Sequence, residues 1–93
     1  MKKEKKFKQA YEFWQKAADF ASKHEVKIMI GHKMLEMINK IRMPIFQKAG
    51  EIIKVAEYMR KEYEQNGNKE SVLRISKLQD AAEKLLKKSK MLH

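Results

Sequence analysis

Three histidines are the side chains of this sequence that could bind a transition metal or transfer a proton near neutral pH. They are His24, His32 and His93, and no two of them have the spacing of three or four residues that brings ligands together on one helix face. His32 and Glu36 do have that spacing, but two ligands are too few for a structural zinc site, which takes four. The chain has no cysteine, which fits a reducing compartment. We therefore expect neither a metal nor a cofactor.

Carboxylates are the second group that could do chemistry. Lys54, Arg60 and Lys61 alternate with four acidic residues on one predicted helix: Glu51, Glu57, Glu62 and Glu64. An acid–base pair needs apolar surroundings that push the proton affinities of its two carboxyl groups apart, whereas these residues fall mainly on the polar side of the helix. The serines have no nucleophile-elbow context, and the sequence has no glycine-rich phosphate loop. We therefore expect no catalytic residues, no enzymatic activity and no small-molecule substrate.

Lysine is the residue type that indicates a partner. The formal charge is +10, and it is concentrated at the two ends. Residues 1–8 carry five lysines and one glutamate, and residues 84–93 carry four lysines and no acid, a net charge of +4 in each case. Four cations also align along one side of the last predicted helix, as in a surface that follows a phosphate backbone: Arg74, Lys77, Lys84 and Lys88.

This distribution predicts contact with a nucleic acid backbone, either DNA or RNA. The predicted contact residues are Lys2, Lys3, Lys5, Lys6, Arg74, Lys77, Lys84, Lys87, Lys88 and Lys90. The chain has 19 lysines and only 3 arginines, whereas base recognition and bidentate phosphate binding favour arginine. We therefore expect binding without sequence specificity. The same lysines have a structural explanation as well, because cations near a helix C-terminus stabilise its dipole.

Amphipathic helices must position these side chains, because one proline and three glycines supply too few turns for a β-rich fold. The first helix is predicted from about Lys3 to Lys23. Its apolar half holds five of the eight aromatic residues, so we expect it to supply the largest share of the core. That half consists of Phe7, Ala10, Tyr11, Phe13, Trp14, Ala17, Ala18, Phe20 and Ala21.

The middle of the chain is harder to divide. Residues 24–31 are predicted to be helical rather than an extended connector, because an isolated strand has no partner in this sequence. From Met34 to Tyr63, apolar residues recur at steps of three and four, and the phase does not change at Pro44. We interpret this stretch as one long helix kinked at Pro44, with a break into two helices as the alternative.

The last helix is predicted from about Glu70 to Met91, after a turn at residues 65–68. Gly67 suits a left-handed position at the end of the preceding helix, and Asn68 or Ser71 can cap the next one. The residues expected to face inward are Ile75, Leu78, Ala82, Leu85 and Leu86. The predicted fold is all-α, a single domain over residues 1–93 that forms a small antiparallel bundle of three helices, or of four if Pro44 breaks the middle one.

The segment Asn39–Ile45 (Asn-Lys-Ile-Arg-Met-Pro-Ile) resembles the phosphoacceptor box of sensor histidine kinases, His-Glu-Leu-Arg-Thr-Pro-Leu. Arg42 and Pro44 match, and a helix around residues 78–86 is similar to the second helix of that family's hairpin. Asn39 stands where the family has its phosphorylated histidine, and the 93 residues contain no ATP-binding domain. The resemblance implies a dimeric helical hairpin that serves as a docking surface without phosphotransfer.

The leading hypothesis is a non-enzymatic basic bundle that contacts nucleic acid as a small subunit of a larger nucleoprotein assembly. The profile is similar to that of small subunits of CRISPR ribonucleoprotein complexes and of virus- or phage-encoded helical proteins. The alternative is a protein–protein interaction module, an adaptor or an inhibitor, that acts through the apolar face of the first helix. A protein partner or self-association is expected in both cases, because so small a chain buries little core. No apolar run approaches the ~20 residues of a membrane span, so we expect a cytoplasmic protein without membrane contact.

Overall fold

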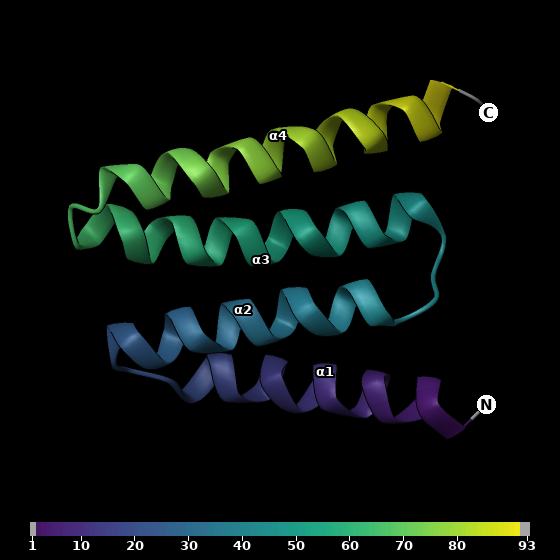
Figure 1. The fold of residues 1–93 in the computed structure, drawn as a ribbon, viewed down its shortest axis with the longest axis horizontal. Helices are drawn as coiled ribbons and strands as arrows, with labels where there is room; N and C mark the ends of the chain where they lie inside the picture. Colours follow the sequence, from purple (N-terminus) through teal and green to yellow (C-terminus); the bar gives the residue numbers. More distant parts are fainter. Residues whose placement is uncertain (1, 92–93) are drawn as a thin grey trace. The chain divides into compact units, whose positions relative to one another are not determined.

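The computed structural model describes the backbone of residues 2–91 and the side chains of residues 6–88. It contains the helices α1 (Lys2–Phe20), α2 (His24–Lys40), α3 (Ile45–Gln65) and α4 (Lys69–Met91) (Figure 1). No strand occurs over the described backbone, so the all-α prediction is confirmed there. α1 pairs with α2 and α3 pairs with α4, each as an antiparallel hairpin, and the chain divides into two compact units, Met1–Arg42 and Met43–His93.

The break between α2 and α3 corrects the expectation of one kinked helix. α2 ends at Lys40, and Ile41 has extended backbone angles (φ −82°, ψ 134°) while its N–H donates to the carbonyl of Met37 at 3.0 Å. Pro44 is the N-cap of α3, and its carbonyl accepts the first hydrogen bond of that helix from the N–H of Lys48 at 2.9 Å. Before the first turn, proline removes no helical hydrogen bond, whereas inside a helix it removes one and clashes with the preceding turn. The alternative of two helices is therefore the correct one.

The helical interpretation of residues 24–31 is confirmed, because they form the first two turns of α2. Lys23 precedes the helix with extended backbone angles and makes no side-chain capping hydrogen bond. Glu25 in the first turn and Lys40 in the last turn have the charges that complement the helix dipole.

In the first unit, α2 rather than α1 supplies most of the buried side chains. α2 buries three large residues at steps of four, the spacing of one helix face: Ile30, Met34 and Ile38. Tyr11 is the one described residue of α1 that is fully buried, while Phe13 and Phe20 are 63% and 88% exposed. The prediction that the first helix carries the largest share of the core is therefore wrong. A helical wheel shows that an apolar face is broad, but it does not show how much of that face is covered.

The turn between α3 and α4 has the predicted form. Gly67 has a φ of +70°, which glycine adopts without a steric penalty. The N–H groups of Gly67 and Asn68 donate to the carbonyls of Glu64 (3.2 Å) and Tyr63 (3.0 Å), which is the Schellman pattern of a helix C-terminus. Asn68 Oδ1 then accepts a hydrogen bond from the N–H of Ser71 at 3.2 Å. Asn68 is therefore the N-cap of α4.

Two glycines of the second unit lead to opposite stability predictions. Gly50 lies inside α3, where an added Cβ has no atom within 4 Å, so Gly50→Ala should raise the free energy of unfolding by about 0.5–1 kcal/mol. Gly67→Ala should lower it by about 1 kcal/mol, because alanine is strained at positive φ. Urea unfolding followed by circular dichroism measures both changes. A Gly67→Ala protein as stable as the unsubstituted one would contradict the turn geometry.

Candidate nucleic-acid interface

The basic residues predicted on the last helix lie on the side of α4 that faces away from α3. Ile75, Gln79 and Ala82 are buried at steps of four and three, and they define the face that packs against α3. We call Arg74, Lys77, Lys84 and Lys88 the basic stripe. The helical repeat of 3.6 residues places this stripe on the opposite side of the helix. Its lysines and their neighbour Lys87 are exposed: Lys77, Lys84, Lys87 and Lys88.

A polar hydrogen-bond network holds α4 in this orientation. The side chain of Gln79 is only 6% exposed, and its Oε1 accepts a hydrogen bond from Arg60 Nη1 of α3 at 2.9 Å. Gln79 Nε2 donates to Glu57 Oε1 at 3.4 Å and to Glu83 Oε1 at 3.5 Å. A buried amide that loses its partners destabilises a fold by about 1–3 kcal/mol. The network therefore favours the rotation of α4 that turns Gln79 toward Arg60.

This rotation corrects two of the expected core positions. Leu78 and Leu85 were expected to face inward, but they are 36% and 45% exposed, while Gln79 occupies the interface. Polar residues are mostly exposed unless they are paired, and the partner of Gln79 lies 19 residues away on another helix. The sequence nevertheless indicated that Gln79 faces the core, because it stands four residues after Ile75 and three before Ala82, in phase with these buried residues.

Glu62 is a second polar residue that differs from expectation. The sequence predicted that the glutamates of this helix form a solvated face, but Glu62 is 6% exposed. Its backbone carbonyl accepts hydrogen bonds from the backbone N–H of Asn66 at 3.2 Å and from Asn66 Nδ2 at 2.9 Å. Glu57 and Glu64 are exposed as expected.

The cations of the stripe are not equivalent. Arg74 Nη2 lies 2.7 Å from Glu70 Oε1, with both side chains about three-quarters exposed. Such an exposed pair is weak and screened by salt, so Arg74 can exchange Glu70 for a phosphate, but its charge is partly compensated. The other four lysines of this face form no ion pair with another described residue. The uncompensated charge therefore lies at Lys77 and in the C-terminal half of α4.

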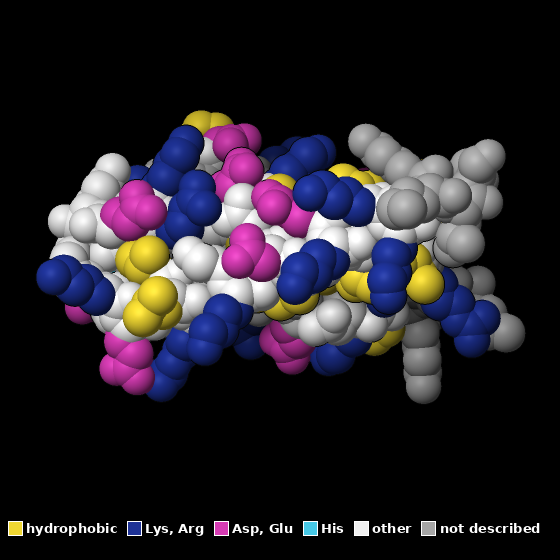
Figure 2. All heavy atoms as spheres, turned by 90° about the horizontal axis from the view of Figure 1, so that it is seen from above, with side chains coloured by type: hydrophobic (Ala, Val, Ile, Leu, Met, Phe, Trp, Pro, Cys, Tyr) yellow, Lys and Arg dark blue, Asp and Glu magenta, His cyan; other side chains and the backbone are white. Residues whose placement is uncertain are grey.

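The outward surface of α4 carries a mixture of charges rather than a continuous basic band. In Figure 2, which faces α4, Lys and Arg side chains are interspersed with Asp and Glu side chains. Asp80 and Glu83 are both exposed and lie between Lys77 and Lys84 in sequence. The densest positive charge is the segment 84–88, which has three lysines and no acid.

The other predicted contact residues lie near the chain ends. Lys6 is exposed on α1, in the first unit. Four further predicted contacts lie outside the residues whose side chains are described: Lys2, Lys3, Lys5 and Lys90. The structure therefore brings together on one face the contacts of α4, and Lys6 belongs to a separate element.

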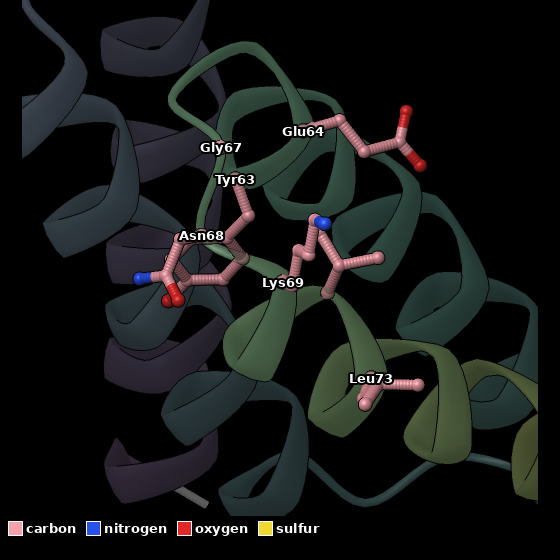
Figure 3. A pocket seen from close by; sticks show the side chains of 7 residues that line it. Tyr63, Glu64, Gly67, Asn68, Lys69 and Leu73 are labelled. Carbon is pink, nitrogen blue, oxygen red and sulfur yellow. The ribbon is translucent and has the colours of Figure 1, made fainter.

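A hollow of about 460 Å³ lies beside the α3–α4 turn (Figure 3). It is lined by Tyr63, Glu64, Gly67, Asn68, Lys69, Val72 and Leu73. Figure 3 shows the Glu64 and Asn68 side chains pointing to opposite sides, so their polar atoms do not converge on one point. No cluster of three or more potential metal ligands occurs in the described part of the chain. This hollow is not an arrangement that can carry out acid–base or metal chemistry.

No protein-family model, curated protein or solved structure matches this chain. The segment that resembles the histidine kinase box is divided in the structure: Asn39 is exposed in the last turn of α2, Arg42 and Pro44 lie in the break, and residues 78–86 belong to the other unit. None of the described helices is long and apolar enough to cross a membrane.

The hydrogen bonds of Gln79 lead to a second stability prediction. Gln79→Ala should lower the free energy of unfolding by about 1–3 kcal/mol, because it leaves Arg60 Nη1 without its acceptor in a partly buried interface. The matched control is Gln47→Ala, an exposed glutamine of α3, which should change stability by no more than about 0.5 kcal/mol. Urea unfolding compares the two variants, and equal stabilities would show that the network does not fix α4.

Proposed function

We propose that this protein is a non-enzymatic helical protein of the cytoplasm that binds nucleic acid through its phosphate backbone, as a small component of a larger nucleoprotein assembly. The observation that carries the proposal is the group Lys84, Lys87 and Lys88. These three side chains are exposed on the outward face of α4, and none of them is paired with an acidic residue among those described. Lys77 and Arg74 extend the group toward the N-terminus of the helix.

The physical basis is the polyelectrolyte character of nucleic acid. Each phosphate that a lysine neutralises releases condensed counterions, and this release supplies most of non-specific binding. Lys84 and Lys88 are one helical turn apart, about 6 Å along the axis, and their flexible stems can reach different phosphates. The interspersed Asp80 and Glu83 reduce the local potential, which suits weak binding that other subunits of an assembly reinforce.

Two of the three arginines, Arg60 and Arg74, support the absence of sequence specificity. Base recognition in the major groove relies chiefly on bidentate arginine contacts to guanine. Arg60 is part-buried and donates to Gln79, and Arg74 is paired with Glu70. Lysine, a point charge on a flexible stem, recognises charge rather than base identity.

Two pairs of lysines provide a matched test. Lys77 and Lys84 are seven residues apart on the outward face of α4, and Lys54 and Lys61 have the same spacing on α3. All four lysines are exposed. Lys54 lies 3.8 Å from Glu51, so part of its charge is compensated. The double variant Lys77→Glu/Lys84→Glu should lower affinity for a mixed-sequence oligonucleotide at least about tenfold more than Lys54→Glu/Lys61→Glu. Fluorescence anisotropy at low salt measures this.

The two double variants change the net charge of the protein equally, so total charge cannot explain a difference between them. A fourfold variant, in which Lys87→Glu and Lys88→Glu are added to Lys77→Glu/Lys84→Glu, should not bind. Equal affinities for the two double variants would contradict an interface on α4, and unchanged binding by the fourfold variant would overturn the proposal.

Salt dependence provides an independent prediction. The logarithm of the binding constant should fall linearly with the logarithm of salt concentration, with a slope of about −0.7 for each phosphate neutralised on a single strand. The variant lacking Lys84 and Lys88 should have a slope smaller by about 1.4 if both contact phosphate. A slope near zero for the unsubstituted protein would mean that phosphate contacts do not drive the interaction.

A protein-interaction module is the second candidate, because Phe13 and Phe20 of the first helix are exposed. Exposed aromatic side chains are common anchors of protein interfaces. Size-exclusion chromatography with light scattering, followed by a polynucleotide-binding assay, separates the candidates. A monomer without affinity for polynucleotide would favour a dedicated protein partner over nucleic acid.

A further inference from the structure

One side of α1 combines cations with exposed aromatic rings. Lys6, Phe13 and Phe20 follow one another at intervals of seven residues, which is 20° short of two helical turns, so they lie nearly in line. Gln9 and Lys16 each follow a member of this line by three residues and flank it. We call these five residues the α1 ridge, and all five are exposed: Lys6, Gln9, Phe13, Lys16 and Phe20.

The two phenylalanines of the ridge are the rings of α1 that the fold leaves most open. Phe13 is 63% exposed and Phe20 is 88% exposed, whereas Tyr11 is buried and Trp14 is half-buried. The Phe13 and Trp14 ring centroids lie 5.3 Å apart with their planes at 77°. This edge-to-face contact restrains the Phe13 ring while most of its surface stays open.

The charge of the ridge has one sign. Lys6 and Lys16 form no ion pair with another described residue, and the ridge contains no acid. The nearest acidic residues are the exposed Glu12 and Asp19, four residues before and three residues after Lys16, so they lie beside that lysine. Each of them is rotated by 100° from the phenylalanine that follows it. A ligand that lies over Phe13 and Phe20 therefore contacts the aromatic rings and the lysines and leaves the two acids to one side.

We propose that the α1 ridge binds single-stranded nucleic acid, with bases stacking on Phe13 and Phe20 and phosphates contacting Lys6 and Lys16. This inference rests on the proposed function and names the form of nucleic acid. Aromatic side chains that stack bases, combined with cations along the backbone, are the means by which proteins bind single strands without reading sequence. In a duplex the base faces are stacked on each other and are closed to a side chain. Phe13 and Phe20 are about 10 Å apart along the axis, close to three steps of a stacked strand at about 3.4 Å each.

The composition of the ridge favours this occupant over a lipid surface or an apolar protein groove. An interfacial membrane helix presents a broad apolar face to the lipid, whereas the exposed rings here form a single line that cations and Gln9 interrupt. The larger apolar face of α1, which contains Tyr11, is directed to the other side of the helix. A partner that supplies flat aromatic groups and regularly spaced negative charge complements every residue of the ridge.

The test uses the full chain and its single tryptophan. Trp14 contacts Phe13, so a base that stacks on Phe13 should change the Trp14 fluorescence. The probes are an oligothymidylate of about 12 nucleotides, within the site sizes known for single-strand binders, a duplex of the same length, and inorganic polyphosphate. The variant Phe13→Leu/Phe20→Leu keeps apolar side chains and removes the flat rings. Phe46→Leu, an exposed phenylalanine of the other unit, is the matched control.

The ridge variant should bind oligothymidylate about tenfold or more weakly, with its affinities for the duplex and for polyphosphate changed less than about twofold. Phe46→Leu should bind all three probes as the unsubstituted protein does. Circular dichroism melts check that the exposed substitutions leave the fold intact.

If the ridge variant binds oligothymidylate normally while the α4 charge reversals abolish binding, the ridge proposal fails and the proposed function stands. If the unsubstituted protein binds none of the probes, both fail. Binding of the ridge to lipid vesicles or to a protein, kept by the leucine variant, would also overturn the single-strand assignment.

Discussion

The hydrogen bond from Arg60 to Gln79 across the α3–α4 interface decides which side chains α4 offers to a partner. A helix of Lys, Leu and Ala can pack with more than one rotation about its axis, and the aliphatic residues alone would place Leu78 and Leu85 inward. The buried amide selects another rotation, because its hydrogen bonds form only when Gln79 faces α3. The lysines on the far side of the helix are exposed as a consequence of that packing.

The packing of the helices determines which charged side chains are exposed. Arg60 donates a hydrogen bond inside the α3–α4 interface and Arg74 is paired with Glu70, whereas Lys77, Lys84, Lys87 and Lys88 are exposed without an ion pair to another described residue. The outward face of α4, with its mixed charge, and the α1 ridge, with its cations and aromatic rings, are different surfaces with different chemistry. In our proposals, the outward face of α4 contacts the phosphates of any polynucleotide, and the α1 ridge contacts unpaired bases.

Much of the local structure could be predicted from the sequence. The α3–α4 turn, with Gly67 at positive φ and Asn68 as the N-cap, followed from residue preferences that act within a few positions. The break at Pro44 did not, because the apolar phase continues across it and periodicity alone does not distinguish a kink from a restart. The exposure of Phe13 and Phe20 and the burial of Gln79 and Glu62 also escaped prediction. The exposure of the phenylalanines depends on contacts between helices, which a single helical wheel does not describe. Gln79 is in phase with the core, but its burial depends on a hydrogen bond from Arg60, 19 residues away on another helix.

The central claim is that the outward face of α4 contacts nucleic acid. A titration of the ¹⁵N-labelled protein with an oligonucleotide, followed by two-dimensional NMR, tests it residue by residue. We predict that the amide signals of Lys77, Lys84, Lys87 and Lys88 shift, and that those of Lys54 and Lys61 do not. Shifts confined to α3, or the absence of any shift at saturating oligonucleotide, would contradict it.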